Sequence, residues 1–379
     1  MNRPYLICNR CIMDTTDPDI QFDESGICNH CKVAFAQLNS KPYCLAPSEK
    51  QKCLEQLVAK IKQSGRNKKY DCIIGLSGGV DSSYVAYKVK ESGLRPLAVH
   101  LDNGWDSELS VKNIENICKK LDIDLFTHVI NWEEFKDLQL SFLKASTPDS
   151  EIPSDHAIVS ILCQLADKKN VRYILAGVNI ASESILPRAW SQGHSDWKYI
   201  KSVHHIFGTV PLKTFPHRSR TKQHYYSLVK KIEWISFLDY LEYDKEKAKK
   251  YLMEKIGFRD YGQKHHESNY TKIYQSYILP TKFGYDKRKA HLSSLICAGQ
   301  ITRDKALEII KEPLYSAKAL EEDIHYLINK FGISREEFEQ IMTLPPKTYM
   351  DYPHYHDTWF ESLGRRIIRF LRRNEKSTS

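Results

Sequence analysis

Short apolar runs and helix-spaced apolar residues alternate through the middle of the chain. The apolar runs predict buried strands at residues 71–76, 95–101, 123–130 and 171–176. Between them, apolar side chains recur at helical spacing, which predicts helices after Tyr84, from Leu109 to Leu121, from about Trp132 to Lys144 and after a cap at Ser154. This order of elements is typical of a parallel sheet with helices on both faces. We therefore expect an α/β fold built on a doubly wound parallel sheet.

A turn of small residues joins the first predicted strand to the helix that follows it. It contains, in order, Ser77, Gly78, Gly79, Val80, Asp81, Ser82 and Ser83. Glycines let a ligand approach the backbone closely, and the N–H groups and dipole of a helix N-terminus favour phosphate. Asp81 falls in the first helical turn, where its carboxylate is placed to act on a phosphate through Mg²⁺. The Walker pattern is absent because the turn holds no lysine. We interpret the turn as a phosphate cradle; an ordinary Gly/Ser turn is the alternative.

Two further turns follow predicted strands at the same edge of the sheet. Asp102 ends the second strand, and Gly177 and Asn179 come directly after the fourth. Ligands of such sheets bind at the carboxyl ends of the strands. We therefore expect these residues to line one nucleotide crevice with the small-residue turn, with Asp102 facing a ribose or an adenine edge. A turn-forming Asp is the alternative role for Asp102.

Four of the ten cysteines form two C-x-x-C pairs near the N-terminus. Cys8 and Cys11 form the first pair and Cys28 and Cys31 the second, with 16 residues between the pairs. This spacing is typical of a closed, tetrahedral zinc site with a structural role. The other six cysteines are scattered. Cys72 falls in a predicted strand and Cys118 and Cys163 on apolar helix faces, so we expect these three to pack in the core.

The second half of the chain predicts a loop and then a mainly helical region from Trp234 onward. In the loop, Glu183 and Arg188 are candidate substrate contacts; an exposed surface loop is the alternative. A dense polar and aromatic stretch at residues 261–288 suits an anionic sugar nucleotide or pyrophosphate. Its candidate substrate residues are Lys264, His265, Glu267, Ser268, Lys282, Lys287 and Arg288.

Three pieces of the sequence together resemble a known family. The turn at residues 77–83 resembles the PP-loop of the ATP pyrophosphatase superfamily. With the double C-x-x-C and the stretch from Tyr261 to Arg288 and on to Ile296, the chain resembles the N-acetyl sugar amidotransferases of bacterial surface-polysaccharide and flagellin-sugar synthesis. The resemblance implies a PP-loop α/β domain with an N-terminal zinc-ribbon-like module. It also implies ATP, Mg²⁺ and Zn²⁺ as cofactors and candidate catalytic roles for Ser77, Asp81, Lys264 and His265.

The family is understood to convert a sugar acetamido group into an acetamidino group. ATP would activate the amide oxygen as an AMP ester, and ammonia would then displace AMP. This chain shows no glutaminase nucleophile motif, because position 2 is Asn and no Gly-x-Cys-x-Gly elbow occurs. The resemblance therefore implies a separate glutaminase partner, with a cyclase-like barrel subunit as a further candidate, and a nucleotide-sugar substrate.

The amino-acid composition of the 379 residues is typical of a globular protein. The net charge of +9 suits anionic partners; a modest charge that only favours solubility is the alternative. No apolar run approaches the roughly 20 residues of a membrane span, and no signal peptide is evident, so we expect a cytoplasmic protein. Five arginines in residues 364–373 alternate with apolar residues, which predicts a packed last helix, a partner-docking helix or weak attachment to a membrane surface.

Two other functions are consistent with parts of the sequence. A PP-loop tRNA-thiolating enzyme would share the loop and the zinc module, but it needs a reactive cysteine, for which only Cys163 is a candidate; we expect no nucleic-acid partner. The second alternative function is that of a zinc- and nucleotide-binding module that catalyses no reaction. We predict three regions: a four-cysteine module at 1–45, a PP-loop domain at 46–230, and a helical substrate-binding region at 231–379.

Overall fold

A five-stranded parallel sheet organises the molecule. The computed structural model describes residues 3–260 and 268–355. The strands are β1 (Cys72–Gly75), β2 (Pro96–Asp102), β3 (Asp124–Val129), β4 (Tyr173–Ala176) and β5 (Glu233–Ser236). They pair in the order β3-β2-β1-β4-β5, and every pair is parallel. The chain therefore crosses from β3 past β1 to β4, and the turn after β1 lies at the middle of the carboxyl edge.

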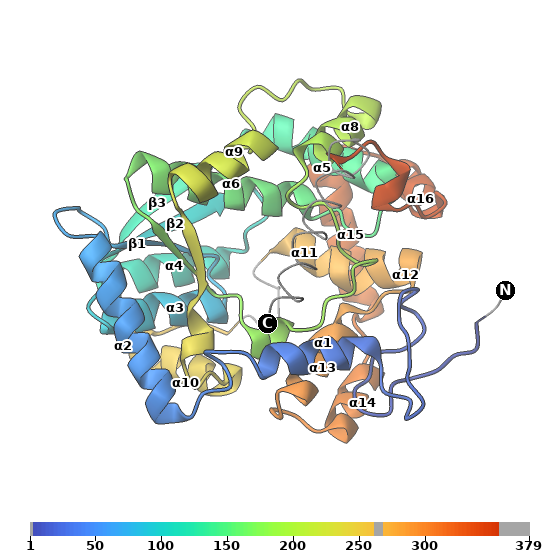
Figure 1. Ribbon diagram of the computed structural model, residues 1–379. Helices are drawn as coiled ribbons and strands as arrows, with labels where there is room; N and C mark the ends of the chain where they lie inside the picture. The colour runs from blue at the N-terminus through green and yellow to red at the C-terminus, as the bar shows by residue number, and fades with distance from the viewer. Residues whose placement is uncertain (1–2, 261–267, 356–379) are drawn as a thin grey trace, which may run out of the picture.

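Helices cover both faces of the sheet, as the alternation of elements predicts (Figure 1). One face packs against α2 (Pro47–Ser64), α3 (Val80–Glu91), α4 (Glu108–Leu121) and α10 (Lys245–Ile256). The other face packs against α5 (Trp132–Ala145) and α6 (Ile152–Lys168), and α8 (Trp197–Phe207) packs on α5. Successive strand residues divide between these layers: Ile73 faces α6 and its neighbours, whereas Cys72 and Ile74 face the α3 layer. The inner strands β1, β2 and β4 are buried on both sides, as a doubly wound fold requires, whereas the edge strands β3 and β5 are partly exposed.

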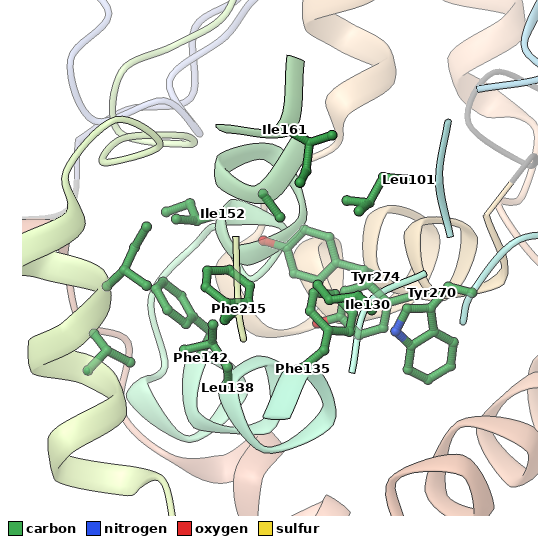
Figure 2. Packing of buried hydrophobic residues seen from close by; sticks show 14 of the residues in the cluster. Leu101, Ile130, Phe135, Leu138, Phe142, Ile152, Ile161, Phe215, Tyr270 and Tyr274 are labelled. Atoms are coloured by element: carbon green, nitrogen blue, oxygen red, sulfur yellow. The ribbon is translucent and has the colours of Figure 1, made fainter. Parts of the chain in front are cut away.

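The C-terminal region is helical and shares its core with the sheet. Its elements are α11 (Asn269–Ile273), the π-turn η3 (Tyr274–Ile278), α12 (Leu279–Phe283), α13 (Lys287–Cys297), α14 (Arg303–Lys311), α15 (Ala317–Phe331), α16 (Arg335–Thr343) and the 3₁₀ turn η4 (Tyr349–Asp351). Figure 2 shows Tyr270 and Tyr274 of this region packed among Ile130, Phe135 and Leu101 of the sheet layer. One hydrophobic cluster thus continues across residue 230, the predicted boundary between the second and third regions.

The remaining elements are short and lie before or between these layers. They are α1 (Asn29–Leu38), α7 (Ile180–Glu183), α9 (Arg220–His224), the π-turn η1 (Tyr225–Val229) and the 3₁₀ turn η2 (Phe237–Tyr240). In the described ranges 3–260 and 268–355, no helix is both long enough and apolar enough to cross a membrane.

One strand was not predicted, and one prediction about these elements is wrong. Trp234 lies in β5, which pairs with β4 and completes the sheet, and the mainly helical region that the sequence predicts follows this strand. Ser154 does not cap α6: the helix starts at Ile152, with Glu151 at the cap position and Pro153 in the first turn, where its missing N–H costs no helical bond. The four other strands and the α3, α4 and α5 helices lie where the sequence predicts them, within a few residues.

Candidate functional site

The turn between β1 and α3 has the geometry of a phosphate cradle. Gly78 has a φ of +78°, and a Cβ added there would lie 2.5 Å from the carbonyl oxygen of Ser110, so only glycine fits. The Ser77 and Ser82 hydroxyls lie 3.1 Å apart, and the Gly79 N–H donates to Ser77 Oγ at 3.3 Å. These bonds hold the turn open over the start of α3.

The N-terminus of α3 is left without a capping side chain. Gly79 occupies the N-cap position, and no side chain caps the helix there. Ser83, in the same turn of helix, is fully buried, and its Oγ has no hydrogen-bond partner in the part of the chain that the structure describes. The dipole and the backbone N–H groups of a helix N-terminus favour a phosphate or pyrophosphate group. The residues present therefore fit the phosphates of a nucleotide.

Asp81 lies where the turns after β1 and β4 meet. Its carboxylate accepts a hydrogen bond from the Tyr243 hydroxyl. A Cβ on Gly177 would lie 3.1 Å from the backbone of Asp81 and Ser82, so a glycine lets the β4 turn pack on the start of α3. The sequence places Asp81 and Gly177 in one crevice, and the structure brings them into contact. Tyr243 is a neighbour that the sequence did not point to.

The turn after β2 borders a hollow at the same edge. The hollow has a volume of 330 Å³ and is lined by Asp102, Asn103, Gly104, Val129, Ile130, Trp132 and Lys330. Asp102 Oδ1 accepts from the Gly104 N–H at 2.9 Å, which is the turn-forming role named above as the alternative to a nucleotide contact. Lys330 donates to the Gly104 carbonyl and lies over the rings of Trp105 and Trp132. A cation from α15 thus reaches the carboxyl edge of β2.

Several other predicted residues hold the backbone rather than face open space. Asn179 caps α7, because its Oδ1 accepts from the N–H and hydroxyl of Ser182. Lys282 donates to the Ile341 carbonyl, and burial lowers the pKa of Lys282 to about 8. Arg288 binds Asp286 and the last carbonyls of α14, including that of Glu312 at 2.8 Å. The structure does not bring Lys282 and Arg288 together with the phosphate turn.

Glu183 and Arg188 are both exposed. Glu183 ends α7, close to the buried Asp239, whose pKa is raised to about 6 by its burial and by the charge of Glu183. Asp239 accepts from the Ile180 N–H at 2.9 Å and so holds α7 against the end of the sheet.

The polar stretch of the C-terminal region returns to the β2 turn. Ser268 pairs in an antiparallel bridge with Asp106, and the Asn269 N–H donates to the Trp105 carbonyl at 2.9 Å. Ser268 also caps α11. The candidate residues Lys264, His265 and Glu267 lie outside the described residues, as does the arginine-rich run at 364–373. Lys287 is at the start of α13 and pairs with Glu151 at 3.3 Å, a partner that the sequence did not indicate.

The four N-terminal cysteines converge on one point. Their Sγ atoms lie within 4.8 Å of one another, and all four side chains are buried. Cys8 Sγ and Cys31 Sγ are 3.9 Å apart, and Cys11 Sγ and Cys28 Sγ are 3.7 Å apart, which suits four thiolates around one tetrahedral ion. Backbone N–H groups of Arg10 and Cys28 point at Cys8 Sγ, as expected for sulfur that carries negative charge. The residues present therefore fit zinc.

The four-cysteine site is joined to the C-terminal region. Arg303 donates to the carbonyl oxygens of Cys11 at 3.0 Å and Cys8 at 3.1 Å. The Ile12 N–H donates to Ser293 Oγ on α13 at 3.2 Å. The same helix reaches the sheet edge, where His291 lies 3.0 Å from the Ser182 carbonyl. Helix α13 thus connects the cysteine site with the turn after β4.

Comparison with known families divides the chain into two recognisable parts. Residues 267–365 match the model described as LPS biosynthesis protein WbpG-like, C-terminal domain, and residues 70–145 match a tRNA methyl transferase HUP domain. The second match covers the strand, turn and helix that form the phosphate cradle. The first covers the helices that pack on the sheet edge.

Curated relatives match part of the chain. The tRNA-specific 2-thiouridylase MnmA 2 of Fusobacterium nucleatum subsp. nucleatum is 29% identical over 142 residues, which are 35% of this chain and 39% of that protein. The tRNA(Ile)-lysidine synthase of Chlamydia pneumoniae is 35% identical over 70 residues, which are 18% of this chain and 22% of that protein. The chain therefore spans well under half the length of these relatives. Among solved structures, the NH3-dependent NAD synthetase from Campylobacter jejuni has a TM-score of 0.32 and 18% identity, with 70% of this chain and 97% of that chain covered.

These findings confirm the family resemblance inferred from the sequence. The chain combines a PP-loop domain of the class found in ATP-using enzymes with a C-terminal domain. That C-terminal domain is WbpG-like, which identifies the kind of PP-loop protein to which the chain is similar.

Proposed function

We propose that this protein is an ATP-dependent amidotransferase of surface-glycan synthesis, such as that of lipopolysaccharide O-antigen. It would convert an acetamido group of a nucleotide-activated sugar into an acetamidino group and release AMP and pyrophosphate. One observation carries the proposal above the others: a WbpG-like domain packs directly on the edge of the sheet that holds the phosphate cradle.

The cradle supports the first half of the reaction. The acetamido oxygen would attack the α-phosphorus of ATP, forming the oxygen–phosphorus bond of an imidate–AMP ester as the bond to pyrophosphate breaks. The N-terminus of α3, with its helix dipole, and the Ser77 and Ser82 hydroxyls would bind the leaving pyrophosphate. Asp81 would hold Mg²⁺, which neutralises phosphate charge when bound. The Tyr243 hydroxyl orients the Asp81 carboxylate for that role.

Ammonia would complete the reaction. Its nitrogen attacks the imidate carbon, the carbon–oxygen bond breaks, and AMP leaves with the former amide oxygen. The product keeps all three hydrogens of the ammonia and is therefore an amidinium cation. The chain's part is to hold the ester and the nucleotide in line and to exclude water. We propose that a separate glutaminase supplies the ammonia, with a cyclase-like subunit as a further partner.

We further propose that the four-cysteine site holds a structural zinc. Four buried thiolates close the coordination sphere, so the ion would stabilise the fold and take no part in the reaction.

The alternative of tRNA thiolation has support from the curated relatives but not from the cysteines. The candidate nucleophile Cys163 is 2% exposed in α6, and burial raises the pKa of its thiol. A thiol that is buried and protonated is a poor nucleophile. The reactive cysteine that this chemistry needs is therefore not provided at position 163.

The test is an incubation with ATP, Mg²⁺, ammonium and a panel of acetamido nucleotide sugars. The proposal predicts AMP, pyrophosphate and a product whose mass falls by the difference between O and NH, resolved by high-resolution mass spectrometry. A non-catalytic module would bind nucleotide and form none of these products. Release of AMP only when a tRNA is added would favour the thiolation alternative.

A further inference from the structure

A mixed group of charged side chains lies at the start of α6. We name it the α6 cluster; it consists of Asp149, Glu151, Asp155, His194 and Lys287. His194 Nε2 lies 3.1 Å from Asp149 Oδ2 and 3.3 Å from Asp155 Oδ2. Lys287 Nζ lies 3.3 Å from Glu151 Oε2. The five residues come from three segments, and Lys287 comes from the WbpG-like domain.

The α6 cluster is next to the nucleotide crevice. Helix α6 precedes β4, so its first turn lies at the carboxyl edge of the parallel sheet. Asn103 of the β2 turn donates to Ser154 Oγ, in that first turn of α6, at 3.2 Å. On the other side, α13 starts with Lys287 and contacts Ser182 after β4 through His291. The cluster therefore lies between the turns that follow β2 and β4.

Burial and neighbouring charges shift the pKa values of three members of the cluster, His194, Lys287 and Asp149. Burial opposes the charged form of His194, but Asp149 and Asp155 outweigh it and raise the pKa of His194 to about 10. Burial likewise opposes the charge of Lys287, and Glu151, Asp149 and Asp155 raise its pKa. For Asp149, the bonds from His194 and Ser191 and the charge of Lys287 overcome burial and lower the pKa to about 2. Two cations thus face three carboxylates.

The base of the cluster is held rigidly, whereas its rim is open to solvent. Asp149 is buried and accepts from the Ser191 hydroxyl at 2.5 Å. Gln275 and Lys287 both donate to Glu151 Oε2, and in the described part of the chain no donor reaches Glu151 Oε1. At the rim, the side chains of Asp155 and His194 are 51% and 36% exposed. The cluster therefore offers acceptors and donors together on a fixed support.

This combination selects the chemistry of the ligand. A free anion would meet three carboxylates, and a metal cation would meet the imidazolium and the ammonium group. A sugar ring carries hydroxyl groups that both donate and accept, so it can bond to carboxylates and cations at once. Hydrogen bonds to charged partners are also the stronger ones.

We propose that the α6 cluster binds the hydroxyl groups of the acceptor sugar, with Glu151 and His194 as its specificity-determining contacts. This inference rests on the proposed function, because it places the sugar beside the bound ATP. It assigns the WbpG-like domain a direct part in the site through Lys287.

The test compares two binding constants in the full-length, zinc-loaded protein. The variants are Glu151→Gln, which keeps shape and removes charge, and His194→Gln, which alters the exposed rim. Glu133→Gln is the matched control, because Glu133 is an exposed glutamate in the first turn of α5, paired with Lys136 at 2.9 Å. Calorimetry with UDP-N-acetylglucosamine, UDP-N-acetylgalactosamine and CMP-linked acetamido sugars gives the sugar affinity. A titration with a non-hydrolysable ATP analogue and Mg²⁺ gives the nucleotide affinity.

We expect each cluster variant to weaken sugar binding about tenfold or more, which corresponds to the loss of one charge-assisted hydrogen bond. The affinity for the ATP analogue should not change in these variants. Glu133→Gln should bind both ligands as the wild type does. If the wild type binds a nucleotide sugar and both variants bind it with the same affinity, the inference is overturned and the proposed function stays in place. Equal losses of sugar and ATP-analogue affinity would also overturn it. If the wild type binds no acetamido nucleotide sugar, the proposed function fails and the inference with it. His194→Gln decides the question if Glu151→Gln melts at a lower temperature.

Discussion

Replacing Arg303 by Met tests whether the cysteine site depends on its clamp to the C-terminal region. Arg303 Nε and Nη2 donate to the carbonyl oxygens of Cys11 and Cys8, one in each half of the first C-x-x-C pair. Methionine keeps much of the apolar stem but removes both donors. The carbonyl groups of Cys8 and Cys11 then lose their hydrogen-bond donor, while all four cysteine ligands are still present.

The magnitude follows from the two bonds. Hydrogen bonds that involve a charged group contribute roughly 1.5–3 kcal/mol each in mutational series. Arg303 is only half-buried, so we take the lower end and expect Arg303→Met to lower the free energy of unfolding by about 2–4 kcal/mol. The loosened pair should also release zinc faster, because the carbonyls orient the backbone that points the sulfur atoms at the metal.

Arg335→Met is the matched control. Arg335 also makes bonds to two residues, but these are Glu321 and Glu339, whose side chains are 66% and 62% exposed. Exposed ion pairs contribute little, so the control should lose less than about 1 kcal/mol. Urea unfolding gives the stability, and transfer of zinc to a chromogenic chelator gives the release rate. Equal stability loss in the two variants, with unchanged zinc release, would refute the reasoning.

Four further predictions concern the site and its surroundings. Asp81→Ala should lower pyrophosphate release about a hundredfold or more in a folded protein, and near-normal release would contradict its phosphate role. Gly78→Ala should abolish binding of an ATP analogue, because a Cβ would collide with the Ser110 carbonyl; retained affinity would mean that the turn does not hold phosphate. Ammonium at high concentration should support turnover while glutamine alone does not, and glutamine-dependent turnover by the isolated chain would overturn the partner proposal. Burial lowers the pKa of His156 from its ordinary 6.5 to about 4, so the unfolded chain takes up a proton that the folded protein does not; the contribution of His156 to the free energy of unfolding should fall by about 1.4 kcal/mol per pH unit from pH 6.5 to 4, and urea unfolding of His156→Asn should show a shallower fall.

The sequence was sufficient to predict the centre of the fold. The first four strands are apolar runs, the first three are each followed by a predicted helix, and the phosphate turn is a contiguous motif. The spacing of Cys8, Cys11, Cys28 and Cys31 predicted their convergence because short knuckles constrain the backbone. The strand β5 was missed because it has four residues and is buried only in part, with Trp234 exposed, so no apolar run marks it.

Contacts between distant segments could not be predicted in the same way. Arg288 has the residue type of an anion ligand, but the free carbonyls at the end of α14 compete for its donors. Asn179 likewise has a local partner in the first turn of α7. His194 and Glu151 lie in segments without a recognisable motif, and the tertiary packing of α13, which also contacts α7, brings Lys287 to Glu151. A sequence pattern shows which groups are available, whereas the tertiary structure decides which bonds they make.

The path of one oxygen atom tests the central claim most directly. A nucleotide sugar labelled with a heavy oxygen isotope in its acetamido carbonyl is incubated with the protein, ATP, Mg²⁺ and ammonium, and the products are analysed by mass spectrometry. Attack of the amide oxygen on the α-phosphorus predicts that the label appears in AMP, in step with formation of the acetamidino sugar. Label that stays in the sugar, or that appears in water or pyrophosphate while AMP remains unlabelled, would contradict the account.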